Sequence, residues 1–216
     1  MRTRHAVIML FGAVLLTGCT TVGAQLATSV QRMTWTLDTK GVPSGKYVLD
    51  PEHTSLLFKI SHLGYSLYVG RFNAVHATMD YDNKHPEASE LVVTVDPNSV
   101  DVNNDKVEKT LTGKDYFDTD EYPQAIYFAR SITIKDKRHG VLNGELTLRG
   151  VTRKLPLDVV FNGGARNALT NKYTIGFTAS GMIKRSDFGM NTLVPLVGDD
   201  VYLEINAEFE RTRDHR

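Results

Sequence analysis

Hydrophobic and polar residues alternate along most of the chain after about residue 45, and this period of two is typical of half-buried β-strands. The clearest run is 201–209, where Val, Leu, Ile, Ala and Phe occupy every second position and polar residues lie between them. The alternation predicts about eight strands, each with one apolar and one polar face. Similar runs occur at 55–60, 75–81, 91–95, 126–135, 145–149, 155–161 and 173–180.

Two irregularities interrupt these runs. Phe72 is out of phase with the set that begins at Val75, so we expect a β-bulge between them. Arg130 interrupts an otherwise apolar face that we expect to contain Ile126, Phe128, Ile132 and Ile134.

Turn and helix signals separate the strands. Helical spacing of Val107 and Leu111, after the capping-box pair Asp105 and Glu108, predicts a short helix that ends at Gly113. A second helical turn is expected over 118–122. Turns are expected at 82–84, 139–140, 162–164 and 198–200, where Gly, Asn, Asp or His residues cluster.

Two architectures fit about eight antiparallel strands. Two sheets can pack face to face, or one sheet can close into a barrel. A barrel of this size is either filled by its own side chains or keeps a cavity for one small ligand. The periodicity does not distinguish these alternatives.

The first eighteen residues have the pattern of a secretory signal. Arg2 and Arg4 precede an apolar run over 6–16, which is shorter than the roughly 20 residues that span a bilayer. Leu16-Thr17-Gly18-Cys19 resembles the lipobox of bacterial lipoproteins. This resemblance implies a signal peptide at 1–18 and lipidation of Cys19, the single cysteine of the chain. Because Thr20 and not Asp follows Cys19, the resemblance implies sorting to the outer membrane, on its periplasmic side.

Composition narrows the possible chemistry. Without residues 1–18 the chain has 23 basic and 25 acidic residues, a formal net charge of −2 with neutral histidines, which does not suggest a nucleic-acid partner. A lipidated Cys19 leaves no thiol for catalysis or metal binding. The irregular polar composition of 20–44 predicts a tether over 19–44 and one domain over 45–216, with Trp35 and Leu37 as possible contacts between them.

Four segments of this domain resemble the YceI-like polyisoprenoid-binding proteins: YVLDPEHTSLLFKISHLGYSLYVGRF, DYFDTDEYPQAIYFARS, LNGELTLRGVTRKLPLDVVFNG and IKRSDFGMNTLVPLVGDDVYLEINAEFE. The resemblance runs from about Lys46 to the C-terminus. It implies an all-β fold, an antiparallel lipocalin-like barrel of about eight strands with one or two short inserted helices. It also implies a cavity for an isoprenoid tail, no enzymatic activity, and a homodimer. Arg149 stands where the family often has His, and its phase on the strand places it outside the cavity.

A barrel that holds a hydrocarbon needs apolar walls, and the inward phase of each strand supplies candidates. An ordinary packed core is the alternative interpretation of the same residues. The candidate ligand-binding residues are Leu56, Phe58, Ile60, Val75, Met79, Phe117, Phe128, Leu146, Leu148, Leu157, Val159, Phe177, Val201 and Leu203, with His62, Arg185 and Phe188 near the barrel ends.

The polar candidates each have two interpretations. His62 continues the inward phase of its strand, so it either meets a head group or is a hydrogen-bonded core histidine. Arg185 either meets an anionic head group or forms a structural ion pair with Asp187 or with other neighbours. His53 is expected to fix a turn. We expect no metal site, no cofactor and no catalytic residues, since no Ser/His/Asp order or Gly-x-Ser-x-Gly motif occurs.

Overall fold

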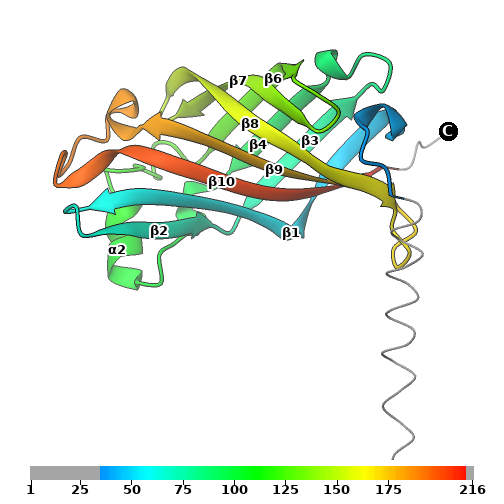
Figure 1. The fold of residues 1–216 in the computed structure, drawn as a ribbon. Coiled ribbons are helices and arrows are strands. Elements are labelled where there is room, and N and C mark those ends of the chain that lie inside the picture. The colour runs from blue at the N-terminus through cyan, green and yellow to red at the C-terminus, as the bar shows by residue number, and fades with distance from the viewer. Residues whose placement is uncertain (1–34, 213–216) are drawn as a thin grey trace, which may run out of the picture.

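The computed structural model describes residues 35–212; Cys19 and the predicted signal peptide lie outside this range. The described residues form mostly strands, with short helical segments between them (Figure 1). The strands are β1 (Gly45–His62), β2 (Ser66–Phe72), β3 (Val75–Tyr81), β4 (Glu90–Val95), β5 (Val100–Asp101), β6 (Ala125–Ile134), β7 (His139–Leu148), β8 (Val151–Arg166), β9 (Tyr173–Lys184) and β10 (Val197–Arg211).

The strands form one antiparallel sheet that closes into a barrel. Its order is β10-β9-β8-β7-β6-β4-β3-β1-β2-β5, and β10 also pairs with β1. The first part of β1 pairs with β3 and its last part with β2, so β2 and β3 together occupy one position around the barrel. Because β5 has only two residues, eight strand positions surround the core, and the predicted barrel is confirmed.

Within residues 35–212, one α-helix and three 3-10 turns lie between strands, and a fourth 3-10 turn precedes β1. α2 (Asp105–Leu111) begins after Asn104, whose side chain accepts a hydrogen bond from the Val107 N–H. Glu108 accepts from the N–H groups of Val102 and Asn104. The predicted second helical turn is a hydrogen-bonded turn in which the Tyr122 N–H donates to the Asp118 carbonyl at 2.8 Å. The 3-10 elements are η1 (Thr39–Gly41), η2 (Pro86–Ala88), η3 (Pro97–Ser99) and η4 (Arg185–Phe188).

The turn predicted at 162–164 is wrong, because β8 runs through it to Arg166. The register shifts between Phe161 and Gly163, where Gly163 adopts a φ of 137°. A Cβ atom on Gly163 would lie 1.4 Å from Nε1 of Trp35. The glycines therefore mark a bulge and a close contact with Trp35. The turn predicted at 198–200 likewise lies inside β10.

The phase predicted for β6 is correct only in its second half. Ala125, Tyr127 and Ala129 are buried, whereas Ile126 is exposed. A register shift between Ala129 and Ser131 then turns Ile132 and Ile134 toward the interior. Between β2 and β3, the expected bulge is instead a break in the strand at 73–74.

Residues 35–44 pack onto the barrel, which corrects the predicted tether boundary. Thr36 and Gly164 exchange backbone hydrogen bonds of 2.8 and 3.0 Å. Val42 is only 1% exposed and belongs to the core cluster that contains Tyr47 and Phe161. We call residues 35–44 the N-terminal strap. It covers the end of the barrel at which β1 begins, on the right in Figure 1.

Candidate ligand cavity

An elongated apolar cavity of about 230 Å³ lies inside the barrel. Its wall consists of inward side chains from strands all round the sheet, since the alternation directs one face of every strand to the interior. The interior is therefore not filled by its own side chains. The apolar wall residues are Val42, Leu49, Leu56, Val75, Ala77, Met79, Pro86, Leu91, Val93, Val95, Ile132, Ile134, Leu142, Leu146, Leu155, Leu157, Val159, Phe161, Ile175, Phe177, Ala179, Leu203, Ile205, Ala207 and Phe209.

Two tyrosines bring hydroxyl groups into this region, and both are hydrogen-bonded. The Tyr127 hydroxyl donates to the Leu155 carbonyl at 3.1 Å, and burial raises its pKa. The Tyr81 hydroxyl donates to the Thr39 carbonyl in the N-terminal strap at 2.6 Å, and burial raises its pKa to about 12. Both hydroxyls stay neutral at ordinary pH, so the wall carries no charge at these positions.

One end of the cavity, which we call the mouth, is polar. It is lined by Thr39 of the strap, Ser89 and Glu90 near η2, and the β6–β7 turn from Asp136 to His139. Because Glu90 and this turn are exposed, the cavity reaches the surface here. Backbone N–H groups of Arg138 and His139 and the His139 ring bond to Asp136 and lower its pKa to about 2.

The opposite end is closed. Phe188 and Met190 are buried with Ala125 and Leu148, and Phe117 packs against this cluster. Phe117 also lies 5.5 Å from Phe72, whose ring centroid is 5.6 Å from that of Phe58. These aromatic rings fill the barrel where β1 ends.

Arg185 holds the backbone of the closed end together. Its guanidinium group donates to the carbonyls of Gly198, Met190 and Val197 at 2.8, 2.7 and 3.0 Å. The residue is 4% exposed, and burial lowers the pKa of its guanidinium group. The group still stays charged, because the ordinary pKa of arginine lies far above neutral pH. Arg185 does not line the cavity, and its guanidinium group donates to backbone carbonyls and not to Asp187.

About half of the predicted ligand-binding residues lie on the cavity wall. Those on its wall are Leu56, Val75, Met79, Leu146, Leu157, Val159, Phe177 and Leu203. Contact with a ligand stays a prediction for each of them.

The other predicted residues lie elsewhere. Six of them are not on the cavity wall: Phe58, Ile60, Phe117, Leu148, Phe188 and Val201. Most of these lie among or beside the aromatic rings that fill the barrel where β1 ends. His62 is exposed at the end of β1, so its inward placement is wrong. Phe128 lies on the outer face of β6, where the Arg130 guanidinium is 4.8 Å from its ring centroid. Strand phase indicates an inward direction, but it does not indicate how deep the cavity extends.

Several wall residues were missed by the sequence analysis. Leu91, Leu155, Ile205 and Phe209 belong to the same alternating runs, so extending each phase along its strand would have found them. Val42 was missed because it lies in the segment interpreted as a tether.

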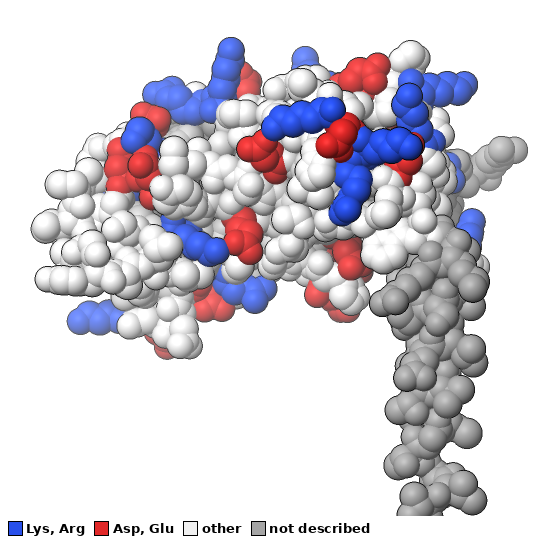
Figure 2. Space-filling model, viewed as in Figure 1, with Lys and Arg blue, Asp and Glu red and all other residues white. Residues whose placement is uncertain are grey.

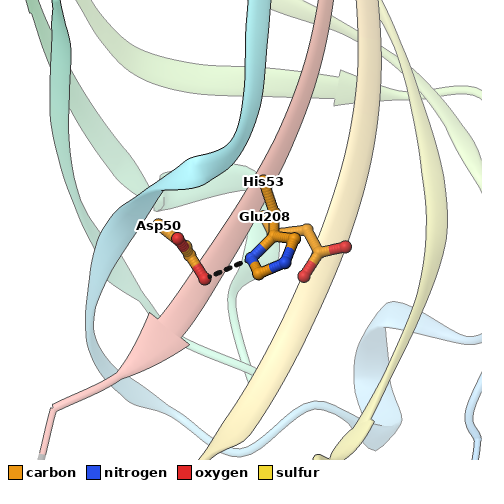
Figure 3. A group of neighbouring side chains, drawn as sticks. All are labelled: Asp50, His53 and Glu208. Carbon is orange, nitrogen blue, oxygen red and sulfur yellow. Dashed lines mark hydrogen bonds and ion pairs between the residues drawn. The ribbon is translucent and has the colours of Figure 1, made fainter.

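A separate polar group lies on the outside of the barrel, at a bulge of β1 against β10. Ligand atoms of Asp50, His53 and Glu208 lie within 4.8 Å of one another (Figure 3). The His53 Nδ1–H donates to Asp50 at 2.8 Å. His53 lies within β1, at a bulge, and not in the expected turn. This hydrogen bond and the charges of Asp50 and Glu208 raise the pKa of His53. None of the three side chains lines the cavity.

Residues 47–209 match the YceI-like domain. A UPF0312 protein of Shewanella baltica is 37% identical over 166 residues, which cover 75% of this chain and 85% of that protein. A UPF0312 protein of Pectobacterium atrosepticum is 34% identical over 168 residues, covering 78% and 86%. The chain belongs to the YceI-like family.

Solved structures show the same fold. The Campylobacter jejuni YceI protein is 31% identical with a TM-score of 0.63, covering 72% of this chain and 91% of that chain. A polyisoprenoid-binding domain from Saccharophagus degradans is 19% identical with a TM-score of 0.58, covering 77% and 98%. The family match begins at residue 47, so the N-terminal strap lies outside it.

Within residues 35–212, no helix is long and apolar enough to cross a bilayer.

Proposed function

We propose that this YceI-like protein binds a long polyisoprenoid of the quinone or polyprenol type, with the tail in the barrel cavity and without catalysis. The observation that carries the proposal is the continuous apolar wall inside a closed barrel. A hydrocarbon needs such a wall, because every polar group left unpaired against it would cost free energy. The mixed polar side chains of the mouth, including Arg138 and His139, then lie where a head group would emerge.

The energetics favour reversible binding. Burying one five-carbon isoprene unit is worth roughly 3–4 kcal/mol relative to water, at about 0.8 kcal/mol per carbon. A bilayer offers the tail a similar gain, so transfer from membrane to barrel is close to balanced. Contacts at the mouth and the shape of the wall decide the equilibrium, which suits a carrier or a store more than a permanent trap.

One further observation supports the proposal. The structurally similar domain from Saccharophagus degradans is a polyisoprenoid-binding domain. The main alternative is an interaction or stress-response lipoprotein whose barrel is packed solid. The open cavity counts against it, since a packed barrel would leave no such space.

The test is to fill the cavity without changing the outside of the barrel. Ala179→Phe adds a ring to the cavity wall on β9, and Ser180→Phe adds the same ring to the exposed face one residue later. After incubation with membranes, mass spectrometry of extracted lipid should find about one prenyl lipid per chain in wild type and Ser180→Phe. Ala179→Phe should lose it while keeping the folded circular dichroism spectrum. Wild-type protein without prenyl lipid would refute the proposal.

We also propose that Cys19 is lipidated and anchors the protein to the outer membrane, facing the periplasm. The support is the basic, apolar and small-residue pattern that precedes Cys19. Cys19→Ser should move the protein from the membrane fraction to the soluble fraction, and a variant that stays with the membranes would contradict the anchor.

A further inference from the structure

Two loops at the closed end of the barrel expose large apolar side chains. One is the hairpin turn between β1 and β2, which contains Leu63 and Tyr65; the other precedes β10 and contains Leu193 and Leu196. Tyr65 is 89% exposed, and Leu196 is 59% exposed. Side chains of this size are usually turned into the core of a soluble domain.

The two loops are held side by side. The Leu63 N–H donates to the Leu196 carbonyl at 2.8 Å, and His62 pairs with Val197 in the sheet. Their apolar side chains therefore form one surface, which we call the apolar tip. It consists of Leu63, Tyr65, Leu67, Leu193, Val194 and Leu196.

The apolar tip lacks charge. Neither 63–70 nor 190–198 contains Asp, Glu, Lys or Arg. In Figure 2 the left end of the molecule is largely white, and charged residues appear around its margin. A contiguous exposed apolar patch bordered by polar residues is typical of an interaction site.

The backbone supports the same interpretation. Leu63 and Leu193 have φ values of 53° and 62°, in the left-handed region that branched apolar residues rarely adopt. Neither side chain gains burial from this conformation, since both are exposed. Strained residues that contribute little to the core are typical of functional surfaces.

We infer that the apolar tip enters the interfacial layer of a phospholipid bilayer. A protruding, uncharged surface of Leu, Val and Tyr suits the boundary between head groups and acyl chains, where tyrosine can keep its hydroxyl in the polar layer. A bilayer also adapts to a protruding loop, whereas a protein partner would need a surface of complementary shape. Because the tip has no basic residue, its binding depends on apolar burial and not on anionic lipid.

The position of the tip fits an anchored chain. The strap enters the barrel at the opposite end, and residues 19–34 can extend at most roughly 55 Å. This is comparable to β10, whose 15 residues span roughly 50 Å. The tip can therefore reach either the anchoring bilayer or one that faces it. The inference rests on the proposed function only in that a carrier of a membrane lipid must contact a membrane to exchange it.

A fluorescent probe can test the contact directly in the full chain carrying Cys19→Ser. Tyr65→Cys places an NBD label on the tip, and Val48→Cys places it on an exposed position of the outer barrel wall. With vesicles of phosphatidylethanolamine and phosphatidylglycerol, emission at position 65 should rise about twofold, shift to the blue and be quenched by acyl-brominated lipid. The label at position 48 should not respond. The response at position 65 should persist in about 0.5 M salt, where exposed charges are screened.

A second pair of changes shows whether the whole tip contributes. Leu193→Asn with Leu196→Asn, in the position-65 labelled chain, should weaken vesicle binding at least tenfold because two apolar side chains no longer enter the bilayer. Equal responses at positions 65 and 48, or a response lost in salt, would overturn the inference.

Self-association is the competing outcome. If emission at position 65 rises with protein concentration in the absence of vesicles, and light scattering shows a dimer that Leu196→Asn abolishes, then a second copy occupies the tip and the inference is wrong. The assay does not depend on bound isoprenoid. Vesicle binding can thus fail while extracted lipid supports the proposed function, or the reverse.

Discussion

The two ends of the barrel are built from the same strands, but one end is open and polar and the other is filled by side chains. At the mouth, polar residues surround the opening and the N-terminal strap covers part of the cavity through Val42 and Thr39. At the closed end, Phe188, Met190 and Arg185 fill the interior, and the apolar side chains that remain point outward. The alternating pattern is similar at both ends, so the difference comes from the loops and not from the strands.

This difference assigns separate tasks to the ends. The mouth opens onto the apolar wall, whereas the closed end fills the interior and exposes the apolar tip. Substitutions at each end should therefore have different consequences, and three predictions test this from the largest effect to the smallest.

The largest effect is expected at the closed end. Arg185→Met removes the donors of three hydrogen bonds and leaves the carbonyls of Met190, Val197 and Gly198 without them. The free energy of unfolding should fall by about 3 kcal/mol in urea titrations, because unpaired buried carbonyls keep their desolvation cost. The exposed Arg153→Met should change it by less than about 0.5 kcal/mol. Equal stability of the two variants would show that Arg185 does not hold this end together.

A smaller effect is expected at the strap. Gly163→Ala should destabilise the protein by about 2 kcal/mol, since the added Cβ meets Trp35 and Ala disfavours a positive φ. Trp35 is the single tryptophan, so its emission should shift to the red as the ring leaves the barrel. Gly176→Ala is the matched control, because Gly176 pairs with Gly163 and its Cβ would meet only Asn162 at 3.7 Å. A Trp35 spectrum that stays unchanged in Gly163→Ala would contradict the contact.

The smallest effect concerns the barrel wall between the ends, where His53 bonds to Asp50. Burial opposes ionisation of Asp50, but hydrogen bonds from His53 and the Glu52 N–H outweigh it and lower the pKa of Asp50. The pKa of His53 is raised, so its contribution to stability is complete below the unfolded value near 6.5 and is lost as pH rises through the folded pKa. The Asp50 contribution is present above about pH 4 and is lost as pH falls through its lowered pKa.

NMR titration should therefore find the pKa of His53 above its ordinary value, and Asp50→Asn should bring it back toward that value. Because the group is exposed, global stability should change little. A His53 pKa that is the same in Asp50→Asn and wild type would show that the two residues do not interact in solution.

The strand content and the inward set were predictable because a period of two directly reflects which face of a strand is buried. For β10 and β3 the predicted phase holds along the strand, and Leu203, Val75 and Met79 reach the cavity wall. In β6 the phase reverses at a bulge, which leaves Phe128 outside and Tyr127 inside. Before Arg130, the alternating positions 125, 127 and 129 and the positions 126 and 128 are both apolar. The sequence alone therefore does not show which of these two sets points inward.

The candidate site was predictable in kind but not in extent. The sequence by itself determined an all-β chain with one apolar face per strand, because alternation is a local property. Tertiary structure alone decided that the sheet closes, that aromatic rings fill one end, that Val42 covers the other, and that Arg185 binds carbonyls. These outcomes depend on which loops meet at each end of the barrel, and such contacts between residues far apart in the chain leave no periodic signal in the sequence.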